Sequence, residues 1–254
     1  MAVLSGKTAL ITGAGTGIGF EIAKKFHEQG AKVVICGRRE EVLKEASKQI
    51  SSGSDGVLWF KADICDEEQV IKLVKDSVKA TGRLDILVNN AAHMRVDKPP
   101  EDTSLGEWKK VLDTNINGVF LCCREAGKVM IQQSSGKIIN IASMSGFIVN
   151  KYFHVGSYEV SKAAVAMLTK AFAVEWAPYN ITVNAIAPGF YETEPNKNFF
   201  AREPEIHQKI LDMIPLSRTG NLNELASLAV MMATDACNYM TGTTITIDGG
   251  YTLW

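Results

Sequence analysis

Two side chains four residues apart, Tyr158 and Lys162, could together transfer a proton. They fall in the stretch GSYEVSKAAV, which otherwise has the apolar pattern of a buried helix. Residues four apart lie on one face of a helix, so the ammonium group would lie beside the phenol. A phenol titrates near ~10, and a neighbouring cation favours its ionised form, which suits it to general acid–base catalysis. The spacing is also common by chance, so the pair alone does not identify a catalytic site.

The segment TGAGTGIG, residues 12–19, is a glycine-rich loop between an apolar run and a helical pattern. Gly13, Gly17 and Gly19 would let the backbone approach a pyrophosphate at the N-terminus of the following helix. Their spacing is G-x-x-x-G-x-G, whereas G-x-G-x-x-G is more common, and a tight turn is the alternative. Because the loop follows the first predicted strand and opens a helix, it predicts a dinucleotide site.

The second apolar run ends in CGRRE, where an acidic residue would bind the adenosine ribose hydroxyls, roughly 20 residues after the loop. Gly37 stands there instead, followed by Arg38 and Arg39. A glycine leaves room for a 2′-phosphate, and a guanidinium can clamp that phosphate with paired hydrogen bonds. The sequence therefore predicts NADP(H) in preference to NAD(H), which stays possible. The alternative is a solvated charge pair at the start of a helix.

Strand and helix patterns alternate along the chain. Apolar runs predict strands at 7–12, 32–36, 57–63, 84–90, 136–143, 180–189 and 243–250, and helical patterns cover 18–30, 40–50, 67–82, 104–131, 157–178 and 223–235. Strands that are apolar on both faces are typical of parallel sheets covered by helices. We therefore expect an α/β fold of the Rossmann type: a doubly wound, seven-stranded parallel sheet with helices on both faces, in a single domain over residues 1–254.

An insert at 190–214 departs from this alternation. It is polar and contains two prolines, and we expect an irregular, lid-like segment over the substrate. Its Phe199 and Phe200 either line a partly apolar pocket or hold the lid to the body of the protein. Further candidates for the pocket wall are Ser145, Phe147, Phe153 and Tyr191.

Composition and charge exclude several functions. The net charge is −1 with no block of like charges, so we expect no nucleic acid or membrane surface as partner. No signal-peptide pattern or long apolar run is present, which predicts a cytoplasmic protein. The five cysteines contain no C-x-x-C pair and are expected to be reduced core residues. The four histidines lack metal-binding spacing, so no metal is expected.

Polar and glycine residues gather at the predicted C-terminal ends of the strands, where ligands bind in open α/β sheets. They include Thr12, Gly13, Asp63, Asn89, Asn90, Ser143, Pro188 and Gly189. The glycine loop, NNAA at 89–92, Asn115 in NINGVF, Ser143, YEVSK, APGFYET and the C-terminal IDGG follow the order and nearly the spacing of one family. Over almost its whole length the chain resembles the short-chain dehydrogenase/reductase family, with a weaker similarity to bacterial gluconate 5-dehydrogenase-like and 3-oxoacyl reductase-like members.

The resemblance implies an NADP(H)-dependent oxidoreductase that interconverts a carbonyl and a secondary alcohol. Tyr158 would be the acid in reduction and the base in oxidation, and Ser143 would hydrogen-bond the carbonyl oxygen. Lys162 would lower the pKa of Tyr158 and hold the nicotinamide ribose. Asn115 would anchor a water linking Lys162 to solvent, although it could also bond a backbone carbonyl and kink its helix. The implied small-molecule substrate would contact Ser143, Ser145, Phe153 and Tyr158.

The resemblance also implies the cofactor contacts. Asp63 would contact the adenine, and Thr193 would bind the carboxamide. The whole expected set is Gly13, Thr16, Gly17, Ile18, Gly19, Arg38, Arg39, Asp63, Ile64, Asn90, Ala91, Ala92, Tyr158, Lys162, Pro188, Gly189, Tyr191 and Thr193. Two positions depart from the family pattern: Ala92 stands where glycine is usual, and Tyr191 where isoleucine or valine is commoner.

Two other functions are alternatives to an oxidoreductase. A regulatory or sensor protein would need only the cofactor residues, so the complete set of Asn115, Ser143, Tyr158 and Lys162 argues against it. An epimerase or dehydratase with tightly held cofactor usually has a larger substrate domain than 254 residues allow. The family resemblance further implies a homotetramer or homodimer, in which the long helices after the fourth and fifth strands pair across subunits.

Overall fold

The computed structural model describes residues 2–51, 56–94, 98–154 and 156–254, and within them seven strands form one parallel sheet. The strands are β1 (Thr8–Thr12), β2 (Lys32–Gly37), β3 (Leu58–Lys61), β4 (Ile86–Asn89), β5 (Gly136–Ile141), β6 (Ile181–Pro188) and β7 (Thr244–Ile247). Their spatial order is β3-β2-β1-β4-β5-β6-β7, so the order of strands reverses between β1 and β4. Such a reversal opens a crevice at the C-terminal ends of the strands. The predicted fold class is confirmed.

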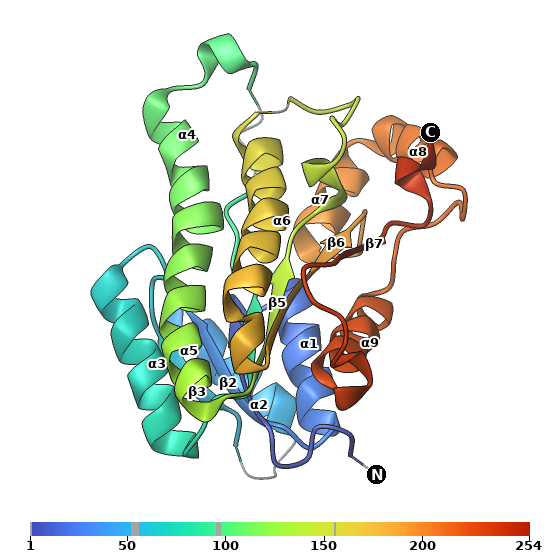
Figure 1. Cartoon of the computed structure of the whole chain (residues 1–254). Helices are drawn as coiled ribbons and strands as arrows, with labels where there is room; N and C mark the ends of the chain where they lie inside the picture. Colours follow the sequence, from blue (N-terminus) through green and yellow to red (C-terminus); the bar gives the residue numbers. More distant parts are fainter. Residues whose placement is uncertain (1, 52–55, 95–97, 155) are drawn as a thin grey trace.

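Helices cover both faces of this sheet (Figure 1). They are α1 (Gly17–Glu28), α2 (Glu40–Ser51), α3 (Glu67–Thr81), α4 (Leu105–Leu112), α5 (Val119–Gln133), α6 (Ser157–Trp176), α7 (Glu194–Arg202), α8 (Pro204–Met213) and α9 (Leu222–Ala233). Alternate residues of β1 point to opposite faces: Ile11 packs in a cluster with α1, α2 and α9, and Leu10 in a cluster with α3, α5 and α6. The inner strands are therefore buried on both sides, as their apolar runs predict, whereas the edge strands β3 and β7 are only partly buried.

The first and last long helices lie side by side on one face (Figure 1). Ile22 and Phe26 of α1 are fully buried in the same cluster as Ala226 and Val230 of α9. The small residues of α9 allow close approach to the larger side chains of α1. The chain thus closes this face of the sheet with segments from its two ends.

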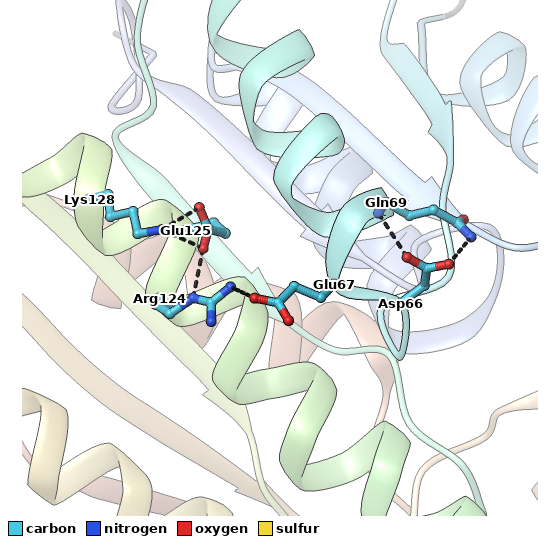
Figure 2. Close-up of polar contacts among 6 residues, drawn as sticks. All are labelled: Asp66, Glu67, Gln69, Arg124, Glu125 and Lys128. Carbon is cyan, nitrogen blue, oxygen red and sulfur yellow. Dashed lines mark hydrogen bonds and ion pairs between the residues drawn. The ribbon is translucent and has the colours of Figure 1, made fainter.

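On the other face, charged side chains link α3 to α5 (Figure 2). Arg124 of α5 bonds Glu67 of α3 and its own neighbour Glu125, both at 2.7 Å, and Lys128 bonds Glu125 at 2.8 Å. Asp66 begins α3 by accepting the backbone N–H of Gln69. These contacts fix the start of α3, directly after the β3–α3 loop that carries Asp63.

A π-helical turn, Asp113–Gly118, interrupts the long helix predicted over 104–131. Asn115 lies in this turn and is buried. Its side chain accepts the N–H of His93 at 2.7 Å, and donates to the carbonyl of His93 and to the Ser161 hydroxyl, both at 3.0 Å. The expected bond from Asn115 to a backbone carbonyl is therefore present, and it ties this helix to the loop after β4 and to α6.

The expectation of an irregular insert at 190–214 is wrong, because most of it forms α7 and α8. Pro195 and Pro204 stand in the first turns of these helices, where a proline removes no helical hydrogen bond. Phe200 is buried and stacks on His207 with ring centroids 4.1 Å apart, and Phe199 lies 5.3 Å from Phe153. These contacts favour the packing interpretation of the two phenylalanines.

The cysteines differ from the expectation in part. Cys36, Cys122 and Cys123 are buried as predicted, whereas Cys65 is exposed and Cys237 is partly exposed. Among the described residues no group of three or more His, Cys, Asp or Glu side chains could hold a metal ion. Within the same residues, no helix combines the length and the apolar character needed to cross a membrane.

Candidate active site

A cleft of about 410 Å³ opens at the C-terminal edge of the sheet, at the point where the strand order reverses. Loops that follow β1 to β6 and the start of α6 form its walls. Most of the predicted residues line it: Gly13, Thr16, Gly17, Ile18, Arg38, Arg39, Asp63, Ile64, Asn90, Ala91, Ala92, Ser143, Tyr158, Lys162, Pro188, Gly189, Tyr191 and Thr193. Residues spread over 180 positions of the sequence thus meet in one cleft, because parallel strands all end at the same edge.

Seven predicted or candidate residues do not line this cleft: Gly19, Asn115, Ser145, Phe147, Phe153, Phe199 and Phe200. Gly19 lies behind the loop, where an added Cβ would overlap the side-chain amide of Asn90 and lie 2.8 Å from the Gly13 carbonyl oxygen. The Asn90 amide in turn bonds the carbonyls of Thr12 and Gly13 at 3.0 and 3.1 Å. Gly19 therefore allows Asn90 to hold the shape of the glycine loop.

Gly37, singled out in the sequence as room for a 2′-phosphate, also lines the cleft. Sequence reasoning missed several other lining residues: Gly15, Val42, Leu43, Ala62, Met94, Thr114, Ile141, Ala142, Pro195 and Asn196. Gly15, Ala62, Thr114 and Ala142 are neighbours in sequence of predicted residues, so adjacency could have indicated them. Pro195 and Asn196 belong to α7, and Asn196 bonds the Tyr191 carbonyl at 2.8 Å. They were missed because the insert was expected to be irregular.

The first turn of α1 fits a phosphate group. Thr16 begins the helix without a side-chain cap, and no acidic residue stands in the first turn. Gly17 has φ +62°, and a Cβ there would meet only the Thr193 methyl at 3.8 Å, so this backbone lies open to the cleft. Uncapped N–H groups at a helix N-terminus carry partial positive charge and bind anions. The glycine loop thus has the form that a dinucleotide pyrophosphate requires.

At the end of the cleft beside β2, the exposed guanidinium of Arg38 could bind an anion. Its side chain is 70% exposed, and its guanidinium lies 4.0 Å from the Asp63 carboxylate. An exposed pair at this distance stabilises little, so the guanidinium can turn to a phosphate at small cost. Gly37 beside it adds no side chain to the space.

Lys162 is buried, with 3% of its surface exposed, and burial lowers the pKa of its ammonium to about 8. Its Nζ donates a 2.7 Å hydrogen bond to the Ile141 carbonyl and lies 5.6 Å from the centre of the Tyr158 ring. Tyr158 is half-buried one turn earlier on α6. The predicted placement of a cation beside the phenol is therefore present.

Ser143 follows β5 by two residues and is 7% exposed. Its Oγ accepts the backbone N–H of Ser145 at 3.1 Å. Because a hydroxyl has a single hydrogen, this bond uses a lone pair and leaves the Ser143 hydrogen for another acceptor. A hydroxyl donor, a phenol and an ammonium thus face one cleft that can also hold a dinucleotide, which is the arrangement needed to protonate a carbonyl oxygen.

Comparison with known proteins agrees with this geometry. A family model described as "Enoyl-(Acyl carrier protein) reductase" matches residues 13–252. The chain is 38% identical to galactitol 2-dehydrogenase (L-tagatose-forming) of Cereibacter sphaeroides over 99% of this chain and 97% of that protein. It is 37% identical to the NAD-dependent glycerol dehydrogenase of Listeria innocua over 98% and 95% of the two chains.

Solved structures are similar over their full length. A short-chain type dehydrogenase/reductase from Mycobacterium marinum is 40% identical with a TM-score of 0.92, covering 99% of this chain and 97% of that one. A protein described as an NAD(P)-dependent gluconate 5-dehydrogenase from Beutenbergia cavernae, with bound NADP at low occupancy, is 36% identical with a TM-score of 0.92 over 100% and 99%. The fold, the cleft and these matches together show that the chain belongs to the short-chain dehydrogenase/reductase family of oxidoreductases.

Proposed function

We propose that this protein is an NADP(H)-dependent enzyme that interconverts a carbonyl compound and a secondary alcohol. The observation that supports it most directly is that Ser143, Tyr158 and Lys162 line the same cleft as an uncapped glycine loop. A sensor that only binds the cofactor has no use for a phenol, a hydroxyl and a buried ammonium at one end of the cleft.

When bound, the nicotinamide would donate a hydride to the carbonyl carbon or accept one from the alcohol. The Tyr158 hydroxyl gives its proton to the carbonyl oxygen in reduction and takes it back in oxidation. The Ser143 hydroxyl donates a hydrogen bond to the same oxygen and stabilises the negative charge that develops there. The Lys162 ammonium favours the ionised form of Tyr158 and holds the nicotinamide ribose. Asn115 anchors a water through which Lys162 recovers its proton.

Different parts of the cleft would hold different parts of the cofactor. Backbone N–H groups of the glycine loop and the first turn of α1 hold the pyrophosphate. The guanidiniums of Arg38 and Arg39 hold the 2′-phosphate, beside Asp63 at the adenine. Asn90, Ala91 and Ala92 line the middle, and Pro188, Gly189, Tyr191 and Thr193 the nicotinamide. The preference for NADP(H) is supported by the exposed Arg38 beside Gly37 and by the NADP-bound relative, although another relative is NAD-dependent.

The substrate would enter beneath the insert at 190–214, with α7 and α8 as the lid. Phe153 would contact its distal part, beyond the reacting carbonyl, whereas the Ser145 hydroxyl accepts a hydrogen bond from Asn150 and is not assigned to the substrate. Related proteins named for galactitol, glycerol and gluconate support testing polyols and sugar acids first. The aromatic side chains Phe153 and Phe199 beside the insert support testing apolar cyclic ketones as well.

The assembly we propose is a cytoplasmic homotetramer. Phe120 of α5 and Val160, Met167 and Val174 of α6 expose between 41% and 76% of their surface. Exposed apolar side chains grouped on two helices are typical of a protein–protein interface. Light scattering after gel filtration should give a mass of four chains, and a monomer would contradict this proposal.

The decisive experiment follows the nicotinamide absorbance of the purified protein with NADPH or NADH. The panel contains galactitol, glycerol and gluconate with the oxidised cofactors, and L-tagatose, acetoacetyl thioester and cyclohexanone with the reduced ones. Turnover of at least one pair supports the enzyme. Saturable cofactor binding without turnover of any panel member would instead favour the regulatory protein.

A further inference from the structure

Asn150 is buried within a stretch that is otherwise open to solvent. It follows Phe147 and Val149, which are 54% and 71% exposed, yet only 4% of Asn150 is exposed. A primary amide is costly to bury unless its polar atoms are hydrogen-bonded. The bonds that it makes should therefore explain its place.

The Asn150 amide nitrogen bridges two segments. It donates to the Ser145 hydroxyl oxygen at 2.7 Å and to a carboxylate oxygen of Glu159 at 3.4 Å. Glu159 is itself buried, and its other oxygen accepts the Gly156 N–H at 3.1 Å at the start of α6. Among the described residues the side-chain oxygen of Asn150, Oδ1, has no hydrogen-bond partner. Of the two polar groups of this side chain, it is therefore the NH₂ group that forms the hydrogen bonds.

The bridge continues to Ser143. Ser145 is held through its hydroxyl by Asn150, and its backbone N–H donates to the Ser143 Oγ at 3.1 Å. This bond is the one that leaves the Ser143 hydrogen free for a carbonyl oxygen. On the other side, Glu159 is the residue next to Tyr158 on α6. A continuous set of hydrogen bonds therefore joins the segment after β5 that carries Ser143 to the helix that carries Tyr158.

We propose that Asn150 is a positioning residue for the reaction, which fixes the Ser143 hydroxyl relative to Tyr158 by acting through Ser145 and anchoring on Glu159. The inference rests on the proposed function, because it assigns a role in the proposed chemistry. Loss of Asn150 would misorient the Ser143 hydroxyl as a hydrogen-bond donor. Its replacement should therefore lower turnover more than substrate affinity.

The first test requires no turnover. Amide hydrogen exchange of Ser145, measured by NMR, should be ~10-fold faster in Asn150→Ala, since one hydrogen bond of ordinary strength no longer restrains this turn. The matched control, Val149→Ala, removes an exposed side chain from the same segment and should leave the exchange rate unchanged. Unchanged exchange at Ser145 in Asn150→Ala would overturn the inference.

The second test is a double-mutant cycle with the panel compound that the wild type turns over best. Asn150→Ala and Ser145→Ala should each lower kcat ~10-fold with KM within about twofold, and the double variant should be no slower than either. Multiplying losses, or a change in KM alone, would contradict an action through Ser145.

A rescue variant tests whether the amide of Asn150 acts by pairing with the carboxylate of Glu159. Asn150→Asp sets a second carboxylate against Glu159 and should lose turnover, whereas Asn150→Asp combined with Glu159→Gln restores an amide–carboxylate pair in the opposite sense and should recover most of it. Failure of the rescue would contradict the anchoring role of Glu159. Absence of turnover in the wild type would disprove the proposed function, while the exchange experiment would still decide whether Asn150 holds this turn.

Discussion

The ammonium nitrogen of Lys162 lies 2.7 Å from the backbone carbonyl oxygen of Ile141, the last residue of β5. One bond thus joins α6 to the strand whose extension carries Ser143. Lys162 is also one helical turn from Tyr158, with its ammonium 5.6 Å from the centre of the Tyr158 ring. The same ammonium therefore contacts the end of β5 and lies beside the phenol. The relative placement of the reacting groups is therefore set by the sheet edge and one helix, both rigid elements.

Replacement of Tyr158 by Phe should abolish catalysis and spare the fold. Loss of the proton donor should lower kcat by about 10²–10⁴-fold, the usual contribution of general acid–base catalysis. The NADPH affinity, measured by fluorescence titration, should stay within a few-fold of the wild type. Retention of full turnover in Tyr158→Phe would disprove the mechanism.

Lys162 should make the unfolding free energy of the cofactor-free protein depend on pH. Its pKa is about 8 when folded and 10.5 in the unfolded reference, so between these values only the unfolded chain binds the proton. The contribution of Lys162 to the unfolding free energy should therefore rise with pH across this window, by about 3 kcal/mol in total. Buried thiols such as Cys36, whose pKa burial raises, contribute in the opposite direction, so the Lys162 contribution is measured as a difference between two proteins. Lys162→Met should lack this rise. Denaturant titrations of both proteins at pH 8 and 10.5 give the difference, and parallel curves would contradict it.

Arg38 should decide between the two cofactors. Arg38→Ala should raise the KM for NADPH by about 10–100-fold, the loss expected for charge-assisted hydrogen bonds, and change that for NADH little. Gly37→Asp should act in the same direction, since its Cβ would make only an ordinary 3.6 Å contact with Leu43 and its carboxylate would repel a 2′-phosphate. Steady-state kinetics with both cofactors check this, and equal effects on the two would refute the NADP(H) preference.

Gly17 should be needed for NADPH binding as well as for the left-handed backbone conformation at this position. Gly17 and Gly6 have φ of +62° and +75°, and a Cβ at either meets nothing closer than 3.8 Å. Alanine should therefore destabilise the protein by a similar ~1–2 kcal/mol at both positions. Only Gly17→Ala should also weaken NADPH binding, because its methyl occupies the approach to the loop. Equal NADPH affinity in the two variants would contradict a pyrophosphate at this turn.

The sequence predicted the sheet and most of the cleft for one physical reason. Strands buried on both faces read as short apolar runs, and their C-terminal ends meet at one edge, so residues such as Ser143 and Asn90 could be assigned to a common site. The helical state of the insert was not predicted because the segment is polar and contains two prolines, whereas a first-turn proline such as Pro195 is compatible with a helix. Asn150 gave no signal, since its burial depends on tertiary contacts with Ser145 and Glu159.

The packing of α1 against α9 has a consequence for synthesis on the ribosome. Residues 17–28 are synthesised long before the helix that covers them, residues 222–233. During translation the apolar face of α1, with Ile22 and Phe26, therefore lacks this partner until residues 222–233 have emerged. A chain that stops before Leu222 would therefore leave this face of α1 without the helix that covers it.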